Sequence, residues 1–374
     1  MEKEKPWEID RRGQCGKQEV SHMRQELGAG MHKVVIVKRR TRLEELKRRY
    51  NTVEQAKFYV EHLGADFSDY EVEHTNYYAA LATARVLAGR YARVQEIDRD
   101  YIPNMIFGAQ DIVVAVGQDG LVANVMKYLD GQPLVGVNPD VKRWEGQLLP
   151  FEAGDLELLL PKVIAGNQSE KRVTMGKAET ADGQVLYAVN DFFIGVNNHT
   201  SARYHMCYNG IVEQQSSSGV IVSTGLGMTG WHASVMAQFR GMARVFLLEC
   251  VPERITAGGT QGAGTIQGTG MTQGAGGICG TGTTLGAGGI CGTDAAWDAG
   301  KLIFQVREPY PSRYTQAELV YGQVTAQDSL SFVSDMAENG VVFSDGILND
   351  TIEFNAGTKL TVCVADRVGR LVTG

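Results

Sequence analysis

The stretch that decides the fold is residues 111–120, which read DIVVAVGQDG. A short run of apolar, β-branched residues that ends in a Gly-rich turn is typical of a buried parallel strand. Residues 121–129 continue with a helical pattern, so the unit is predicted as strand, turn and helix. A tight turn at the carboxyl end of a parallel strand is the usual place for ligand binding in α/β proteins.

Similar units lie on both sides of this stretch. Helical patterns are predicted over residues 43–63 and 76–89, and strands over residues 33–38, 70–73, 93–97 and 133–138. Strands that alternate with helices indicate an α/β layer built on a parallel sheet.

The pattern changes after residue 150, where helices become scarce and short strands dominate. Residues 172–177 and 184–189 flank the turn Ala181-Asp182-Gly183, which predicts a hairpin. Further strands are predicted at 192–196, 203–208, 219–223, 245–249, 302–306, 318–324, 330–333 and 341–344. We therefore expect a flexible tail (1–31), an α/β nucleotide-binding domain (32–150), a β-rich substrate domain (151–354) and a C-terminal segment (355–374) that packs back on the first domain.

Glycine is enriched, but mainly in one place. Of 45 glycines, 15 fall between Gly258 and Gly292, within a repeat of period 12 that covers residues 262–297. A duplicated surface loop is the interpretation we favour for this insertion. A stacked Gly-rich solenoid is the second interpretation, and a phosphate-binding cradle is the third, because no strand-to-helix context surrounds the repeat.

Charge and cysteine usage limit the classes of partner. The formal net charge is −7, yet residues 1–50 alone carry +6. A basic segment can bind nucleic acid or anionic lipid. A helix with a charged, solvated face explains the positive charge better, so neither partner is expected.

The chain has no apolar run of membrane-spanning length. Six cysteines without CxxC spacing, and no signal-like segment, predict reduced thiols in a cytoplasmic protein.

Asp119 is the first candidate for chemistry. Gly117 and Gly120 leave room for backbone N–H groups to approach phosphate at a helix N-terminus. The Asp119 carboxylate can accept a proton from a hydroxyl nucleophile or help to hold Mg²⁺. The simpler alternative is a turn in which Asp119 caps the helix.

A second motif follows the strand predicted at residues 219–223. Gly225, Gly227 and Gly230 spell G-x-G-x-x-G, with Glu249 at the distance of a ribose-binding acid. This pattern predicts an NAD-dependent oxidoreductase, provided that residues 244–248 form the next strand. The absence of further alternating helices and strands counts against that alternative.

Two shorter motifs complete the set. Asn190-Asp191 stands at a predicted strand end, where an amide beside a carboxylate can bind an adenine edge or a ribose hydroxyl. Asp345-Gly346 follows another strand. Each is also consistent with an ordinary turn.

Taken in order, these four motifs resemble the NAD kinase family, which carries a Gly-Gly-Asp-Gly turn, Asn-Glu, a Thr-Pro-Thr-Gly-Ser-Thr-Ala-Tyr segment and a late Asp-Gly. The resemblance implies a Rossmann-like domain followed by a β-sandwich-like domain, with substrate in the cleft. It implies that ATP with Mg²⁺ is the phosphoryl donor and that NAD is the acceptor. Asp119 would then activate the ribose 2′-hydroxyl of NAD. Diacylglycerol and sphingosine kinases belong to the same superfamily, so a sugar or lipid acceptor is the alternative. A homo-oligomer, dimer or tetramer, is also implied. The implied nucleotide-binding residues are Gly117, Gln118, Gly120, Asn190, Asp191, Thr224, Gly227, Thr229 and Trp231.

The sequence also departs from the family pattern. Gln118 stands where the family has glycine, and Asp191 is one methylene shorter than the family's glutamate. Met228 replaces serine and Trp231 replaces tyrosine, which removes two hydroxyl hydrogen bonds but leaves an aromatic face for stacking. A nucleotide-binding protein without catalytic activity is therefore a further alternative.

Overall fold

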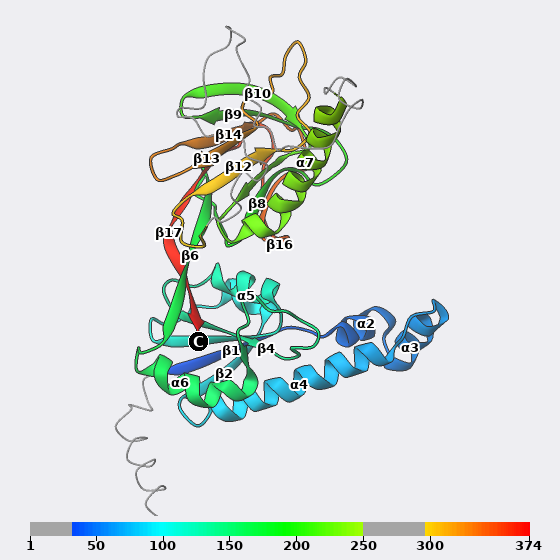
Figure 1. The fold of residues 1–374 in the computed structure, drawn as a ribbon, viewed down its shortest axis with the longest axis vertical. Coiled ribbons are helices and arrows are strands. Elements are labelled where there is room, and N and C mark those ends of the chain that lie inside the picture. The colour runs from blue at the N-terminus through cyan, green and yellow to red at the C-terminus, as the bar shows by residue number, and fades with distance from the viewer. Residues whose placement is uncertain (1–31, 250–295) are drawn as a thin grey trace, which may run out of the picture.

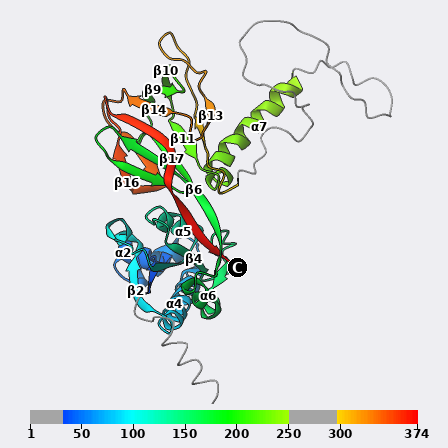
Figure 2. The same ribbon diagram turned by 90° about the vertical axis from the view of Figure 1, so that its left-hand side faces the viewer.

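The computed structural model describes residues 32–249 and 296–374, arranged as two lobes (Figure 1). The lower lobe in this view contains a sheet covered by helices, and the upper lobe contains mostly strands. Figure 2 shows that two long strands, β6 (Ser169–Thr180) and β17 (Lys359–Thr373), run from one lobe into the other. The predicted α/β plus all-β fold class is confirmed.

The first lobe is built on a parallel sheet with the order β2-β1-β3-β4. Its strands are β1 (Lys33–Lys38), β2 (Arg93–Asp98), β3 (Asp111–Val116) and β4 (Pro133–Asn138). Because successive side chains of a strand point to opposite faces, the apolar runs supply two cores. Val34, Ile36 and Val114 pack with α4 (Ser68–Ala88) and α6 (Leu156–Ile164). Val35, Val37 and Val113 pack with α5 (Asp119–Met126) on the other face.

An arm of two helices, α2 (Arg42–Tyr50) and α3 (Val53–His62), projects from this lobe (Figure 1). The sequence predicted one helix over residues 43–63, but Asn51 adopts φ +67° and Thr52 caps α3. The strand predicted at residues 70–73 is also wrong, because these residues lie in α4. Phe67 and Ala56 anchor a small separate core at the arm.

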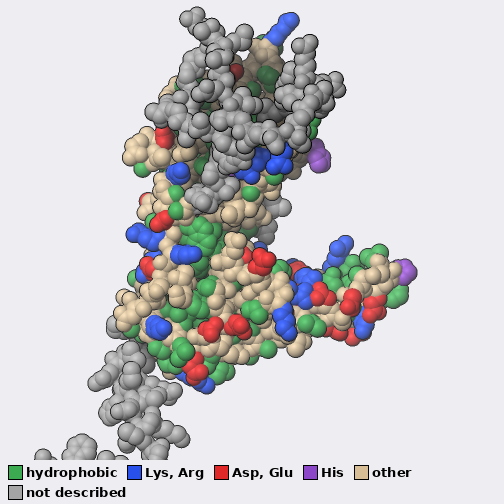
Figure 3. Space-filling view, viewed as in Figure 1, with side chains coloured by type: hydrophobic (Ala, Val, Ile, Leu, Met, Phe, Trp, Pro, Cys, Tyr) green, Lys and Arg blue, Asp and Glu red, His purple; other side chains and the backbone are tan. Residues whose placement is uncertain are grey.

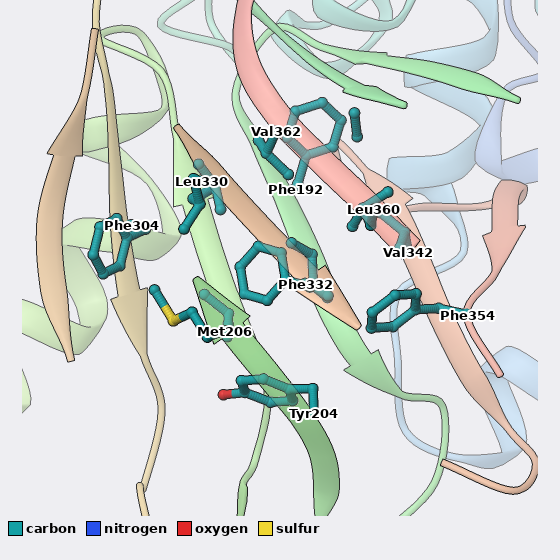
Figure 4. Packing of buried hydrophobic residues seen from close by; sticks show 14 of the residues in the cluster. Phe192, Tyr204, Met206, Phe304, Leu330, Phe332, Val342, Phe354, Leu360 and Val362 are labelled. Atoms are coloured by element: carbon teal, nitrogen blue, oxygen red, sulfur yellow. The ribbon is translucent and has the colours of Figure 1, made fainter. Parts of the chain in front are cut away.

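The second lobe is a sandwich of two sheets. One contains β13-β12-β11-β8-β15-β16, and the other contains β10-β9-β14 next to β17, β6 and β7. The strands are β7 (Val185–Ala188), β8 (Asp191–Val196), β9 (Ala202–Tyr208), β10 (Ile211–Ser217), β11 (Val220–Ser223), β12 (Leu302–Val306), β13 (Tyr321–Val324), β14 (Leu330–Ser334), β15 (Gly340–Ser344) and β16 (Ile347–Glu353). Between the sheets, Phe192 and Val342 from one meet Phe332 and Leu360 from the other (Figure 4).

The pairing of β6 with β17 joins the lobes into one continuous sheet. The two strands are antiparallel over most of their length, with an irregularity between Val364 and Val368. At its far end β17 pairs in parallel with β4, so that Arg370 lies opposite Pro133. A two-residue strand, β5 (Phe151–Glu152), adds to the other end of β4.

Some local predictions fail in the second half of the chain. Residues 245–249 were predicted as a strand but form the end of α7 (Trp231–Glu249). Strands β10 and β16 were not predicted. The tail (1–31) lies outside the described residues, as does all but the last two residues of the repeat at 262–297. In the part of the chain that the structure describes, no helix is both long and apolar enough to cross a membrane.

The sandwich core predicts a large cost for truncating Phe332, of which 1 % is exposed. Phe332→Ala should lower the free energy of unfolding by about 3–5 kcal/mol, because it removes buried apolar surface and leaves a cavity. Chemical denaturation followed by circular dichroism measures this. Phe58→Ala is the matched control, since that ring is 62 % exposed, and should change stability by at most about 0.5 kcal/mol. Equal effects of the two substitutions would contradict the assignment of the core.

Candidate functional site

The turn at residues 117–120 connects the carboxyl end of β3 to α5. The N–H of Gly117 donates to Val137 O across to β4, at 3.1 Å. A Cβ at Gly117 would lie 2.9 Å from a methyl carbon of Leu121, so a larger residue would require the Leu121 side chain to shift. Gln118 is the N-cap residue and Asp119 is the first residue of α5. The turn thus presents a carboxylate at the edge of the sheet where α/β proteins bind ligands.

One oxygen of Asp119 is fixed and the other has no hydrogen-bond donor. Asp119 Oδ1 accepts a hydrogen bond of 2.7 Å from the N–H of Leu148, and the side chain is half-buried. Among the described residues, no group donates a hydrogen bond to Asp119 Oδ2. The N-terminus of α5 favours negative charge at this position. Asp119 is therefore an oriented carboxylate with one oxygen available to a ligand.

The Asn190 and Thr224 motifs lie against each other in the second lobe. The N–H of Thr224 donates to Asn190 O at 2.9 Å, and Thr224 Oγ1 donates to Val189 O at 2.5 Å. A Cβ at Gly227 would lie only 2.0 Å from Asn190 O. Only glycine allows these two backbone segments to approach so closely.

Asp345 connects the fourth motif to the same place. Its backbone is left-handed, with φ +54°. Its carboxylate accepts hydrogen bonds from the N–H groups of Val189, Asn190 and Asp191, the shortest being 2.6 Å from Asn190. Its own N–H donates to Asp191 O at 2.9 Å. Three of the four motifs therefore form one hydrogen-bonded cluster.

Two acidic side chains in this cluster are electrostatically unusual. Burial, together with the charge of Asp345, raises the pKa of Asp191 to about 7. Burial also raises the pKa of Asp345, while Lys127 and the three backbone N–H groups oppose that rise. The hydrogen bonds favour Asp345 as the ionised member of the pair, so Asp191 is the one that holds a proton near neutral pH.

The cluster and the Asp119 turn meet at the boundary between the lobes. Val189 and Leu226 belong to the same apolar core as Leu121 of α5 and Leu148. At the other end of α5, Lys127 is only 1 % exposed. Its Nζ lies 2.6 Å from Asp350 Oδ2 of β16 and donates to Ser344 Oγ at 3.1 Å. The same Asp350 oxygen accepts a hydrogen bond of 2.5 Å from the Tyr128 hydroxyl. Lys127 and Tyr128, which follow α5, are thus both connected to the second lobe.

Sequence reasoning missed Lys127, Tyr128 and Asp350. No motif marks them, and Asp350 lies far along the chain from α5. The available signal was a lysine and a tyrosine that end an otherwise apolar helix, since a buried lysine requires a partner.

Thr229 and Trp231 lie at the side of the cluster. Thr229 Oγ1 donates to Leu226 O at 3.3 Å within a short 3₁₀ turn, Gly227–Thr229. The Trp231 ring stacks on Phe193 at a centroid distance of 5.6 Å, and the Arg307 guanidinium carbon lies 5.5 Å from the ring centroid. The described chain thus already supplies stacking partners for Trp231.

The dinucleotide fingerprint at Gly225, Gly227 and Gly230 is a coincidence of spacing. The preceding strand, β11, pairs antiparallel with both β8 and β12. The strand expected after the helix is instead part of α7. A dinucleotide fold requires parallel strands joined by a helix, so the oxidoreductase alternative is wrong.

The described residues alone do not form a complete Mg²⁺ site, so the ion would need further oxygen atoms from a bound ligand. Within residues 32–249 and 296–374, no three His, Cys, Asp or Glu side chains are grouped so that they could hold a metal ion. Mg²⁺ commonly uses one or two carboxylates together with substrate phosphates. The free oxygen of Asp119 would suit that role if phosphate oxygens of a bound ligand supplied the remaining ligands.

The described chain thus has a Rossmann-like lobe that carries a ligand-type turn, followed by a β-sandwich that contacts this lobe through the turn's own helix. Among solved structures, the chain is similar to an NAD kinase from Archaeoglobus fulgidus in complex with ATP: 13% identity, 92% of this chain and 94% of that chain covered, TM-score 0.47. It is also similar to yeast NADH kinase complexed with NADH: 12% identity, 91% and 83% covered, TM-score 0.49. No protein-family model and no curated protein matches the sequence.

The close approach of Gly227 to Asn190 predicts a strong effect of one added methyl group. Gly227→Ala should lower the free energy of unfolding by about 1–3 kcal/mol, because the backbone must move to relieve the clash. Gly241→Ala is the control: this glycine lies in α7 with open space at its Cβ position, and alanine there should stabilise the helix slightly. Urea denaturation compares the two. An unchanged midpoint for Gly227→Ala would argue against the packing described.

The raised pKa of Asp191 predicts a pH dependence of stability. The pKa of this carboxyl group is near 3.8 in the unfolded state and about 7 in the folded state. Between these two pH values, the native state therefore holds a proton that the unfolded state has released. Stability from this group is therefore lost as pH rises from about 4 to about 7. Asp191→Asn cannot ionise and should gain stability relative to the wild type across that range. Denaturation at several pH values tests this; parallel curves for the two proteins would refute it.

Proposed function

We propose that the protein is an ATP-dependent phosphotransferase whose acceptor is the 2′-hydroxyl of NAD, with Asp119 as general base. The observation that carries the proposal is the Asp119 carboxylate, held by Leu148 through one oxygen and open at the other. It stands at the N-terminus of α5, beside the boundary where the Asn190 cluster meets the first lobe. A sugar or lipid hydroxyl is the alternative acceptor.

The proposed phosphoryl transfer requires no covalent intermediate on the protein. The acceptor hydroxyl oxygen attacks the terminal phosphorus of ATP, and its proton passes to Asp119. A new P–O bond forms while the bond to the β-phosphate oxygen breaks, and ADP leaves with that electron pair. Phosphoryl transfer of this kind depends mainly on positioning and on neutralisation of charge. Mg²⁺ bound to the phosphates of ATP supplies part of that neutralisation when the nucleotide is present.

The remaining residues are assigned to positioning. We assign Asn190 and Asp191 to the adenosine part of the acceptor, with Thr224, Gly227, Thr229 and Trp231 in the segment that lines the nucleotide site. Gly117, Gln118 and Gly120 form the phosphate-binding turn. We further expect a cytoplasmic homo-oligomer, dimer or tetramer, whose mass light scattering would measure.

One observation favours a second candidate, a nucleotide-binding protein without turnover. The Gln118 side chain is half-buried at the turn, where the resembling family has no side chain at all. If this side chain displaces a phosphate from the position needed for in-line attack, nucleotides bind but do not react.

Asp119→Asn tests the proposed function directly. ATP-dependent formation of NADP should fall by about 10²–10⁴-fold, because the amide accepts no proton. Asp130→Asn is the matched control, the same substitution at an exposed residue beyond α5, and should keep wild-type turnover.

Two outcomes would overturn the assignment. If Asp119→Asn keeps wild-type activity, the base is another group. If the wild type phosphorylates none of NAD, NADH, sugars and lipids but binds ATP or NAD by calorimetry, the second candidate is correct.

A further inference from the structure

A small cavity of about 260 Å³ lies where β6 and β17 pass from one lobe to the other. We call it the waist cavity. Figure 3 shows Lys and Arg side chains at the same waist between the lobes. No residue of the Asp119 turn or of the Asn190 cluster lines this cavity, so it is separate from the candidate site. Its lining residues include Arg172 and Thr174 of β6, Ala365 and Arg367 of β17, and Asp298 and Gly300 of the segment before β12.

An irregularity of β17 forms one wall of the waist cavity. Residues 365–367 of β17 lie opposite the single residue Met175 of β6. Extra residues of this kind form a β-bulge, which bends a strand and turns a side chain in a new direction. Bulges are also enriched beside functional sites. Here the extra residues include Arg367, whose side chain lines the cavity.

The facing wall is anchored to β6 by hydrogen bonds. The N–H of Thr174 donates to Trp297 O at 2.7 Å, and the N–H of Gly300 donates to Thr174 Oγ1 at 3.1 Å. Lys171 Nζ lies 4.6 Å from the centre of the Trp297 ring. Asp298 lies between the two anchored residues. Both walls are therefore held in place by the protein itself, which reduces the entropic cost of binding a ligand.

Neither arginine of the waist cavity is neutralised by a described residue. Arg172 is exposed and Arg367 is half-buried, and no described carboxylate pairs with either guanidinium group. The Arg367 Cζ lies 3.3 Å from the centre of the Tyr187 ring. Contact this close uses the flat face of the guanidinium group, so the N–H groups at its edge remain able to donate hydrogen bonds.

Other cations on the same two strands are compensated. Arg370 pairs with Glu170 at 2.8 Å, and Lys177 pairs with Glu179 at 2.7 Å. In the waist cavity, by contrast, two arginines and one aspartate leave a net charge of +1. Asp298 forms no ion pair with a described cation, so its carboxylate does not cancel the charge of either arginine directly. The cavity is thus a preformed hollow with available donors of positive charge.

We infer that the waist cavity binds a small oxyanion, whose carboxylate or phosphate group contacts Arg172 and Arg367. The planar N–H fork of arginine matches the oxygen atoms of both groups. Sites for drug-sized ligands usually measure about 300–1,000 Å³, so this cavity suits a compact anion rather than a whole nucleotide. The inference goes beyond the proposed function. A bound anion would contact both strands that join the lobes.

Calorimetry of the full chain with malate and with inorganic phosphate, at low and constant ionic strength, tests this inference. Arg172→Gln and Arg367→Gln should each weaken binding about tenfold, the loss expected for one charge-assisted contact. Neither change leaves a described carboxylate unpaired. Arg93→Gln is the matched control, since Arg93 is an exposed arginine at the start of β2 that also lacks a described carboxylate partner, and it should leave the affinity unchanged.

Asp298→Asn tests the same site with an effect of opposite sign. It removes a negative charge from the cavity wall, so binding of the anion should become roughly threefold tighter or more. A substitution that only disturbs the structure would weaken binding, so tighter binding separates an electrostatic effect from damage to the fold.

The two probes identify the group that is bound. Binding of malate alone indicates a carboxylate, binding of phosphate alone indicates a phosphate group, and binding of both indicates that either group suffices. If neither anion binds the wild type, or if both arginine variants keep the wild-type affinity, the inference is wrong. NADP formation measured on the same samples reports on the proposed function separately, because none of its assigned residues lines the waist cavity.

Discussion

The antiparallel pairing of β6 with β17 is the constraint on which the site depends. These strands carry the backbone hydrogen bonds of one sheet from the β-sandwich into the parallel sheet, where β17 also pairs with β4. Two lobes joined by a flexible linker would change their relative orientation freely. Here the connection is a hydrogen-bonded ladder, so the carboxyl edge of β3 and the Asn190 cluster have a defined relation to each other. The irregularity between Val364 and Val368 is the place where this ladder is weakest.

Buried charge completes the boundary between the lobes. Lys127 is out of solvent, and its ammonium group contacts Asp350 and Ser344 from the opposite lobe. Removing one partner of such a pair is far more costly than the pair is stabilising, so these contacts specify one docking arrangement. The Asp345 carboxylate also fixes a local arrangement, because it accepts hydrogen bonds from the backbone N–H groups of Val189, Asn190 and Asp191. Both devices work at the boundary, where an apolar surface alone would allow the lobes to slide.

Local sequence predicted those parts of the fold that local physics determines. The apolar runs at β1, β3 and β4 are continuous because both faces of a parallel sheet are covered, and they are visible without a structure. The strand prediction for residues 70–73 was wrong because it placed Glu73 on the solvent-facing side of a strand. Glu73 is instead a buried residue of a helix and is paired with Arg39 and Arg42. Residues 245–249 have strand propensity but belong to α7, since propensity is a weak determinant compared with tertiary context. At the site, motif order selected Asp119 and Asn190 as candidates. No local pattern shows that Asp350 is the partner of Lys127, or that Glu73 is the partner of Arg39.

The stack of Phe193, Trp231 and Phe343 has an optical consequence. Trp231 stands directly after the loop that packs on Asn190, and a cationic guanidinium lies over its ring. The emission of an indole depends on the electric field across it and on nearby charge. A shift of the loop would therefore change the surroundings of this fluorophore. Trp231 is one of four tryptophans in the chain, so a variant that keeps Trp231 alone would report such a shift beside the candidate site without a label.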